Sequence, residues 1–313
     1  MNPTTLFTPK NPLRIGTRRS PLALAQAEMV ANALRAVWAL AEGSTVLVPM
    51  LASGDKIQDR PLADIGGKAL WTKELERALV EDIVDVAVHS MKDVETVRAD
   101  RYRIAAMLPR ADVRDRLVGA ASIAELPKGA RLGTSSPRRA AQMLALRPDL
   151  NIVPLRGNVQ TRLAQIDAGV ADASLLAAAG LDRLAMDDIG ADIETHDMLP
   201  AASQGAIGID ILAARNDLFD MLAAINDIPT FAAVMAERAF LASVGGTCHS
   251  PVAALAIIEG ETLYLRAEIL SEDGSERHAG DVRFNISDTD AAGNLAARLL
   301  AAASPNLRAL FQI

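Results

Sequence analysis

Apolar and polar positions along the chain follow two different periods, which predict strands alternating with helices. Residues 13–17, 45–50 and 84–88 form short runs with the length and composition of strands. Apolar residues then recur at helical spacing from Leu22 to Val37, after Ser20 as an N-cap and Pro21 at the first helical position. Residues 53–60 are polar and contain a glycine, which predicts a mobile loop. A second helix face is formed by Trp71, Leu75, Ala78, Leu79 and Asp82.

The middle third repeats this order of elements. Strand-like runs at residues 130–133, 151–155 and 173–177 each lead into a polar turn and a helical segment. Ser136 and Pro137 again mark the start of a helix. Strands that alternate with helices favour an α/β architecture with a mostly parallel sheet, in which ligands bind at the carboxyl ends of the strands.

The last third has a different pattern, which is typical of a small α+β domain. Thr230 is placed to cap a helix over residues 231–244, and a glycine-rich loop from Gly245 to Ser250 follows it. We expect strands at 252–258, at 263–269 and near 282–284, and then a helix at 291–303. The loop-like segment 194–203 is expected to carry the chain between domains.

Composition narrows the possible classes of function. The chain has 313 residues, half of them hydrophobic, which is enough for two or three folded domains. A net charge of −7 and an aromatic content of 3% disfavour nucleic-acid binding. One cysteine excludes an internal disulfide, and with four scattered histidines it argues against a zinc site, so no metal is predicted. No apolar run approaches the ~20 residues of a membrane span, and the N-terminus does not resemble a signal peptide, so we expect a cytoplasmic protein without a membrane partner.

Arginine supplies 26 of the 32 basic residues. Codon bias in a GC-rich genome would explain the excess, and any single arginine is more simply explained as a surface ion pair. Guanidinium groups near helix N-termini bind anions strongly, however, and their placement here indicates a ligand with several carboxylates or phosphates, without saying which. Six arginines lie at or just after predicted strand ends: Arg18, Arg138, Arg139, Arg156, Arg162 and Arg183.

Two further features could carry chemistry. Lys92-Asp93 follows an apolar strand, and is either an exposed ion pair or a carboxylate in an arginine-lined cleft that stabilises a cation or moves protons. Cys248 is either a small buried hydrophobe or, in its Gly-Gly-Thr loop, a nucleophile, and the adjacent His249 is expected to be incidental. The chain has no P-loop, dinucleotide-binding, nucleophile-elbow or zincin motif.

Several short blocks occur in a fixed order and spacing. They are residues 15–24 (IGTRRSPLAL), 66–68 (GGK), 89–93 (HSMKD), 133–139 (GTSSPRR), 155–162 (LRGNVQTR), 179–183 (AGLDR), 204–206 (QGA) and the Cys248 loop. In this order the blocks closely resemble the porphobilinogen deaminase family, also called hydroxymethylbilane synthases. The resemblance runs from about Leu13 to the C-terminus and is most specific in the first 250 residues.

The resemblance implies a fold and an activity. It implies three domains, formed by residues 1–108 with 204–224, by 109–203 and by 225–313. The first two would be α/β domains like the halves of a periplasmic binding protein, flanking a cleft, and the third a small α+β domain. The implied enzyme is a monomeric transferase of tetrapyrrole and haem biosynthesis. It condenses four molecules of its small-molecule substrate, porphobilinogen, head to tail with loss of ammonia on a covalent dipyrromethane primer, and then releases hydroxymethylbilane by hydrolysis.

The resemblance also assigns roles to residues. Asp93 would be catalytic, and Cys248 would hold the dipyrromethane cofactor through a thioether. The cofactor would also contact Lys92, Asp93, Ser136, Arg138, Arg139 and Arg162. Substrate-binding positions would be Arg18, Ser20, Arg156, Arg183, Lys68 on a mobile segment over the cleft, and Gln204. The chain departs from common family residues at Trp71, Pro137, Ser203 and Thr247, where Phe, Leu, Gly, and Gly or Ser are frequent.

Two other classes of protein share part of this pattern. A non-catalytic anion-binding protein would use the arginines but would leave Asp93 and Cys248 without a role. A cysteine hydrolase or acyltransferase would use Cys248 and His249, but it needs an orienting residue that the sequence does not reveal. Only the deaminase is expected to carry a pyrrole bound covalently to the cysteine.

Overall fold

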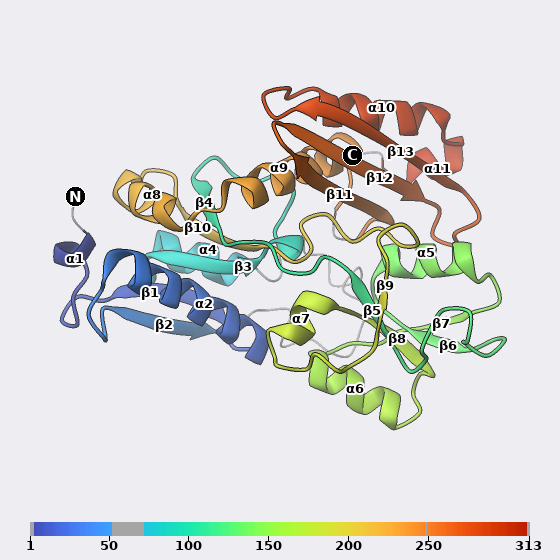
Figure 1. Cartoon of the computed structure of the whole chain (residues 1–313), viewed down its shortest axis with the longest axis horizontal. Helices are drawn as coiled ribbons and strands as arrows, with labels where there is room; N and C mark the ends of the chain where they lie inside the picture. The colour runs from blue at the N-terminus through green and yellow to red at the C-terminus, as the bar shows by residue number, and fades with distance from the viewer. Residues whose placement is uncertain (1–2, 52–71, 248, 312–313) are drawn as a thin grey trace. The chain divides into compact units, whose positions relative to one another are not determined.

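The computed structural model describes residues 3–51, 72–247 and 249–311 of the chain. These residues form two compact units, each built from two separate stretches of sequence. The first unit comprises Met1–Ala111 and Ala206–Phe231, and the second comprises Asp112–Gly205 and Ala232–Ile313. Figure 1 labels the helices and strands of both units. The division into three domains stays a prediction.

The first unit is built on a five-stranded mixed sheet. β1 pairs in parallel with β2 and β3, whereas β10 pairs antiparallel with β3 and β4. Because β10 is antiparallel to both of its neighbours, β1, β2, β3 and β4 run in the same direction, as the prediction of a mostly parallel sheet requires, and β10, which enters from a distant part of the sequence, is the reversed strand among them. In spatial order the strands are β2 (Thr45–Met50), β1 (Leu13–Arg18), β3 (Val86–Ser90), β10 (Ile207–Leu212) and β4 (Tyr102–Met107).

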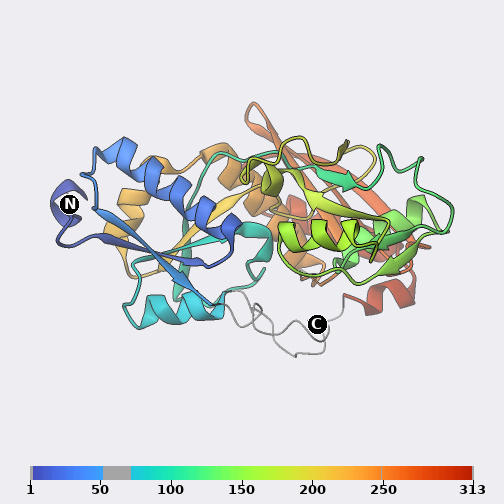
Figure 2. The ribbon, with the colours of Figure 1, turned by 90° about the horizontal axis from the view of Figure 1, so that it is seen from below.

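Helices cover both faces of this sheet (Figure 2). α2 (Pro21–Trp38) packs on the face that carries Val86 and Val88, and α4 (Lys73–Val80) packs on the face that carries Ala87. Successive residues of a strand point to opposite faces, so the apolar run in β3 supplies both cores. Shorter elements complete the unit: α1 (Pro3–Leu6), the 3-10 turns η2 (Met91–Asp93) and η3 (Ala223–Ile225), and α8 (Asn216–Leu222).

The second unit contains another five-stranded mixed sheet. β6 pairs in parallel with β7 and β8, and β5 pairs antiparallel with β8 and β9. In spatial order the strands are β7 (Asn151–Val153), β6 (Arg131–Gly133), β8 (Ala173–Ala177), β5 (Asp115–Val118) and β9 (Ala191–Ile193). The parallel strands lead into α5 (Pro137–Leu146), α6 (Val159–Asp167) and α7 (Ala178–Asp182).

The helix starts in this part of the chain follow from side-chain caps. Ser136 Oγ accepts a hydrogen bond from Arg139 N at 3.4 Å at the start of α5, and Asn158 Oδ1 accepts one from Thr161 N at 2.9 Å at the start of α6. Pro137 takes the first helical position of α5, where its missing N–H costs nothing. The predicted caps at Ser20 and Ser136 are both confirmed.

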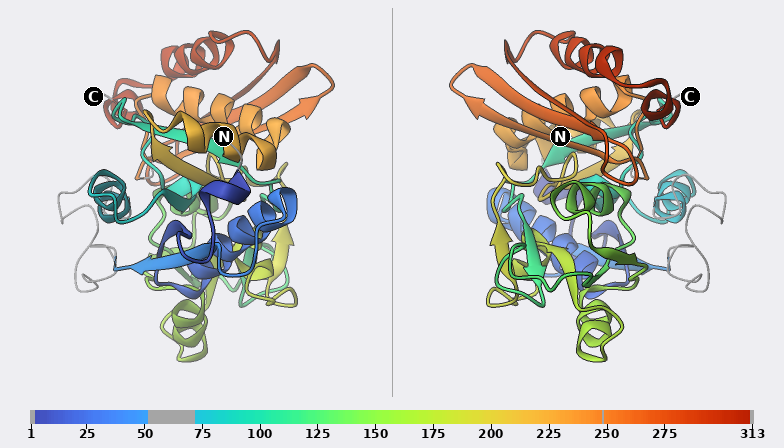
Figure 3. Two further views of the ribbon diagram at one scale, coloured as in Figure 1. Left: turned by 90° about the vertical axis from the view of Figure 1, so that its left-hand side faces the viewer. Right: turned by 90° about the vertical axis from the view of Figure 1, so that its right-hand side faces the viewer.

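The same unit also holds the C-terminal three-stranded antiparallel sheet (Figure 3). α9 and α10 contribute to the core on one face of this sheet, through Phe240 and Leu295 packed with Leu265. Its elements are β11 (Val252–Glu259), β12 (Thr262–Leu270) and β13 (Arg277–Asn285), with α9 (Ile228–Ser243), α10 (Ala291–Ala302) and α11 (Pro305–Ala309). The expected α+β architecture of this region is confirmed.

Two local predictions are wrong. Asp227, and not Thr230, caps α9, since Asp227 Oδ1 accepts a hydrogen bond from Thr230 N at 2.8 Å. Thr230 Oγ1 instead accepts from Arg110 N at 2.9 Å. Asp82 is not on the face of α4, because the helix ends at Val80 and Asp82 has a left-handed φ of 54°. The predicted loop at 53–60 lies outside the described residues.

No single helix in the described part of the chain is both long and apolar enough to cross a membrane. Asn216–Ile225 and Ile228–Ser243 meet that criterion only as a pair, and the pair bends by 112°.

Candidate functional site

Four predicted site residues of the first unit follow two neighbouring parallel strands. Arg18 is the last residue of β1, and Ser20 caps the helix that follows. Lys92 and Asp93 lie in η2, directly after β3. Because β1 and β3 run in parallel side by side, their carboxyl ends share one edge of the sheet. The fold therefore brings these four residues to the same edge.

The Asp93 carboxylate has no structural partner in the described part of the chain, where it makes no hydrogen bond or ion pair. The residue is half-buried at the end of η2. Structural carboxylates at such positions usually accept hydrogen bonds from nearby N–H groups, as Asp227 does in this chain. The Asp93 carboxylate is thus available to a ligand.

A buried polar cluster lies beside this edge and includes a residue of the same strand. His89 Nε2 lies 3.6 Å from Asp210 Oδ2, and Arg98 Nη2 lies 2.5 Å from the same oxygen. Arg98 also pairs with Glu76 at 3.0 Å. Burial, reinforced by the positive charges of Arg98 and Arg18, lowers the pKa of His89 to about 3. His89 is therefore neutral at physiological pH.

This histidine makes the stability of the protein depend on pH. The folded pKa lies below the unfolded value of 6.5, so the unfolded state binds more protons and stability falls as the pH drops through 6.5. We expect His89 to cost about 2 kcal/mol of unfolding free energy between about pH 8 and pH 5. In urea unfolding, the His89→Gln variant should lose less unfolding free energy than the parent between about pH 8 and pH 5, and the difference should be about 2 kcal/mol. The exposed His196→Gln serves as the control and should behave like the parent; an unchanged loss in His89→Gln would contradict the assignment.

The predicted site residues of the second unit follow three neighbouring parallel strands. Ser136 comes after β6, Arg156 after β7, and Arg183 after β8 and the short helix α7. The strand order β7-β6-β8 places these connections at one sheet edge. Arg162 lies in the first turn of α6, where its Nε donates to Gly157 O at 3.0 Å. The expected clustering of arginines at strand ends is thus present within this unit.

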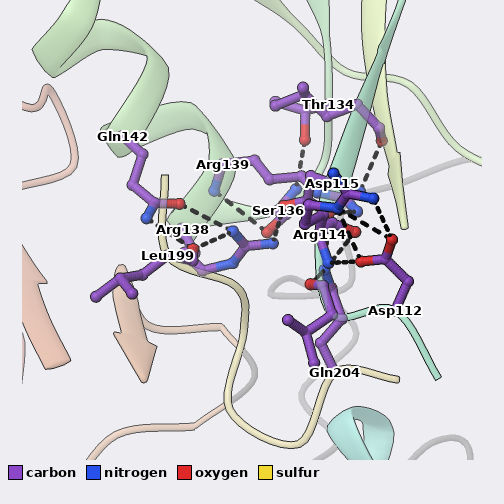
Figure 4. Close-up of polar contacts among 12 residues, drawn as sticks. Asp112, Arg114, Asp115, Thr134, Ser136, Arg138, Arg139, Gln142, Leu199 and Gln204 are labelled. Atoms are coloured by element: carbon purple, nitrogen blue, oxygen red, sulfur yellow. Dashed lines mark hydrogen bonds and ion pairs between the residues drawn. The ribbon is translucent and has the colours of Figure 1, made fainter. Parts of the chain in front are cut away.

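Arg138 and Arg139 are buried and share one carboxylate (Figure 4). Arg138 Nη2 lies 2.8 Å from Asp115 Oδ2, and Arg139 Nη2 lies 2.6 Å from Asp115 Oδ1. Gln204 Nε2 donates to Asp115 Oδ1 at 2.9 Å, so the predicted substrate residue Gln204 belongs to the same cluster. Burial lowers the pKa of Arg138, and the Asp115 charge opposes this effect.

Arg138, Arg139 and Arg183 keep donors that no described residue uses. In the described part of the chain, the Nε atoms of Arg138, Arg139 and Arg183 are buried without a hydrogen-bond partner. Arg183 Nη2 donates to a backbone carbonyl, Gly205 O, at 2.6 Å, and burial lowers the pKa of Arg183 to about 10. Buried donors are normally satisfied, so three such N–H groups indicate a missing acceptor. A ligand with several carboxylates would supply it.

The cysteine loop is described only in part. Cys248 and Lys68 lie outside the described residues, as does Trp71. Burial lowers the pKa of the neighbouring His249, and the positive charge of Arg156 acts in the same direction, which places His249 near Arg156. Ser203, just before Gln204, has a left-handed φ of 67° that glycine adopts more easily, which explains why glycine suits this position. No group of three or more His, Cys, Asp or Glu side chains suited to a metal ion occurs in the described ranges.

Two residues of the arginine cluster, Asp115 and Gln142, do not stand out as site residues in the sequence. Asp115 stands in the run Arg114-Asp115-Arg116, which resembles an ordinary surface charge pattern. Gln142 lies one turn after Arg138, and its Oε1 accepts from Arg138 Nη1 at 2.9 Å. The only local signal was this spacing of four residues, which brings side chains together on a helix.

Solved structures and curated proteins similar to this chain are known. A periplasmic sulfonate-binding protein, SsuA, from Methylobacillus flagellatus KT shows 16% identity and a TM-score of 0.39, covering 74% of this chain and 68% of that one. A TRAP periplasmic solute-binding protein from Desulfovibrio salexigens shows 12% identity and a TM-score of 0.40, covering 68% and 72%.

The similarity to curated proteins is much greater. The chain is 59% identical to the porphobilinogen deaminase of Sphingopyxis alaskensis over 98% of both chains. It is 47% identical to that of Paracoccus denitrificans, covering 87% of this chain and 88% of the relative. Residues 13–220 match the family model "Porphobilinogen deaminase, dipyromethane cofactor binding domain", and residues 231–302 match that of the C-terminal domain. The chain therefore belongs to the porphobilinogen deaminase family, the hydroxymethylbilane synthases.

Proposed function

We propose that the chain joins four porphobilinogen molecules head to tail and releases hydroxymethylbilane by hydrolysis. As a family member it is a transferase of tetrapyrrole biosynthesis. In each condensation the aminomethyl carbon of one substrate forms a bond to an unsubstituted pyrrole carbon. The C–N bond to the amine breaks, ammonia leaves, and the pyrrole carbon loses its proton, so each step is balanced without an oxidant or reductant.

The observation that carries this proposal is the set of unused arginine donors in the second unit. Porphobilinogen bears an acetate and a propionate, and a growing chain accumulates them. The buried Nε groups of Arg138, Arg139 and Arg183 are donors suited to such carboxylates. Arg18, Ser20, Arg156, Arg162 and Lys68 are proposed to bind further carboxylates. Gln204, whose amide nitrogen donates to Val113 O and to Asp115, is proposed to hold the arginine cluster in place. A net charge of −7 gives the protein no general affinity for anions, so the attraction must be local.

Asp93 is proposed to act on the positive charge that the substrate develops as ammonia leaves. Its carboxylate follows β3 and makes no hydrogen bond or ion pair within the described chain. A fixed negative charge beside a developing cation lowers the barrier because it needs no reorganisation during the reaction. The same carboxylate can accept the proton lost by the pyrrole. Lys92, adjacent in η2, would bind a carboxylate of the cofactor.

The cofactor proposed for this site is dipyrromethane, joined by a thioether to Cys248. The residues fit such a group, since the orphaned Nε atoms are buried and need carboxylate acceptors. When bound, the cofactor would supply the free pyrrole carbon that begins the chain. The carboxylates of the cofactor would be held by Arg138, Arg139, Ser136, Arg162 and Lys92.

We also propose that the protein is a monomer and that it is located in the cytoplasm. Light scattering would test the oligomeric state, and cell fractionation would test the location.

The cofactor assignment is tested by the intact mass of the purified, denatured protein. We expect an excess equal to two condensed pyrrole units, which peptide mapping places on the Cys248 peptide. Cys248→Ala should carry no covalent adduct. His249→Gln should keep it, because His249 has no role in attachment, whereas a cysteine hydrolase would need that histidine. An adduct recovered from Cys248→Ala would overturn the proposal. A parent that is purified without the excess mass and gains none on incubation with porphobilinogen would overturn it as well.

A further inference from the structure

A buried carboxylate of the C-terminal sheet reaches the helix that carries the paired arginines. Glu268 lies on β12 and is fully buried. Its Oε1 accepts a hydrogen bond from Gln142 Nε2 at 2.5 Å, and Gln142 lies on α5. Its Oε2 accepts from Arg277 Nε at 2.6 Å. Glu268 faces away from the α9–α10 core, because the residues on either side of it, Ala267 and Ile269, contribute to that core.

The polarity of these hydrogen bonds fixes the orientation of Gln142. An ionised carboxylate can only accept, so the amide NH₂ of Gln142 must point at Glu268. The amide oxygen of Gln142 must then point the other way, where it accepts from Arg138 Nη1 at 2.9 Å. Arg138 can only donate, so it needs that oxygen. With the opposite amide orientation, the Gln142 oxygen would face the Glu268 carboxylate, and the Gln142 NH₂ group would face the Arg138 guanidinium.

The chain of contacts holds Arg138 at both terminal nitrogens. Nη1 donates to Gln142 and to Leu199 O at 2.9 Å, and Nη2 pairs with Asp115. Only Nε is left without a partner among the described residues. The direction in which this remaining N–H points is therefore set by Asp115 on one side and by Gln142 together with Leu199 O on the other.

A second observation shows that the β12–β13 turn is fitted closely to α5. Gly274 in this turn has a left-handed φ of 70°. A Cβ added there would lie 2.5 Å from Ala145 N and closer still to Ala141 O, both in the backbone of α5. Backbone atoms of a helix cannot move aside as a flexible side chain can. The turn and the Glu268 contact thus hold α5 at two separate points.

From these contacts we infer that Glu268 is a positioning residue. It orients the Gln142 amide and thereby aims the free Nε–H of Arg138 at the cofactor. The inference rests on the proposed function, which makes Arg138 a cofactor ligand. It gives the C-terminal sheet a second role besides carrying the cysteine loop, because β12 also preorganises a donor that receives the cofactor.

The test measures how fast the apo-protein gains the covalent adduct. Full-length variants are produced in cells that make no porphobilinogen, porphobilinogen is added, and the mass gain is followed with time. We expect Glu268→Gln and Gln142→Leu each to slow adduct formation about fivefold, which is the equilibrium effect of one hydrogen bond. The double variant should be no slower than the slower single variant, because both changes break the same chain of contacts.

The control removes a different ion pair of the same sheet. Arg283→Gln breaks the exposed pair between Arg283 and Glu259, which does not involve α5, and should form adduct within twofold of the parent rate. A merely structural Glu268 would lower the melting temperature and leave the adduct rate unchanged, and that result would overturn the inference. Effects that multiply in the double variant would also overturn it. If Glu268→Gln does not fold, Gln142→Leu still tests the inference. A parental rate of adduct formation in Gln142→Leu would overturn it.

One more variant separates the inference from the proposed function. Arg138→Leu should slow adduct formation more than either single variant, because it removes the donor itself. A parental rate in Arg138→Leu would mean that the proposed cofactor role of Arg138 is wrong. A slow Arg138→Leu together with a parental Glu268→Gln would instead overturn only the positioning role of Glu268.

Discussion

Replacing Asp115 by Asn is expected to lower the unfolding free energy of the second unit by about 3–5 kcal/mol, the typical cost of breaking a buried ion pair. The Asp115 side chain is fully buried between two guanidinium groups, at 2.8 Å from Arg138 and 2.6 Å from Arg139. Asn would remove the negative charge that both buried guanidinium groups share. Its NH₂ group would also face donors, since Gln204 Nε2 already donates to one oxygen of Asp115. Denaturant unfolding monitored by circular dichroism measures the loss.

The matched control for this variant is Asp172→Asn. Asp172 also pairs with an arginine, Arg131, at 2.6 Å, but both side chains are more than two-fifths exposed. Water compensates for the lost pair there, so the expected cost is at most about 1 kcal/mol. If the two substitutions lower the unfolding free energy equally, burial does not determine how much these ion pairs contribute to stability, contrary to our interpretation.

Asp93→Asn is expected to reduce kcat by about 10²–10³-fold, the usual cost of removing one group that stabilises transition-state charge. Its fold and stability should be preserved, because the Asp93 carboxylate makes no hydrogen bond or ion pair within the described chain. Asn keeps the shape of the side chain but not its charge. The binding of substrate carboxylates by arginines is unaffected, so KM should change less than kcat. Steady-state release of hydroxymethylbilane measures both.

Asp100→Asn is the control for this variant. Asp100 is an exposed carboxylate seven residues further along the chain, outside the proposed site, and its removal should leave turnover at the parent level. If Asp93→Asn turns over at a near-parental rate, Asp93 does not stabilise the developing charge. If it fails to carry the covalent adduct, the defect lies in cofactor assembly, which intact mass reveals directly.

Most of the regular elements could be predicted from the sequence, because their own residues determine them. The strand at Thr45–Met50 and the strand at Ala173–Ala177 have the predicted bounds, and the serine caps at Ser20 and Ser136 are where expected. A cap depends on a few adjacent residues, and a short apolar run bounded by polar turns is likewise a local signal of a strand. The direction of β10 could not be predicted this way, because pairing with β3 and β4 depends on segments about 100 residues away.

The candidate site likewise has one part that could be predicted from the sequence and one part that could not. The position of arginines at strand ends is a local property and could be seen in the sequence. Their partner Asp115 could not, because it reaches Arg138 and Arg139 from more than 20 residues away along the chain. Glu268 is more than 120 residues from Gln142. Such contacts are determined by tertiary packing, and no spacing rule along the chain reveals them.

The position of β10 also affects the time course of synthesis. The first sheet needs β10 between β3 and β4, but all of Asp112–Gly205 is translated before that strand emerges. At ordinary translation rates of 5–20 residues per second the interval is about 5–20 seconds. During this interval the facing edges of β3 and β4 have no partner strand, which exposes them to pairing with other chains. The first sheet of a nascent chain of this protein therefore stays incomplete until Leu212 has left the ribosome.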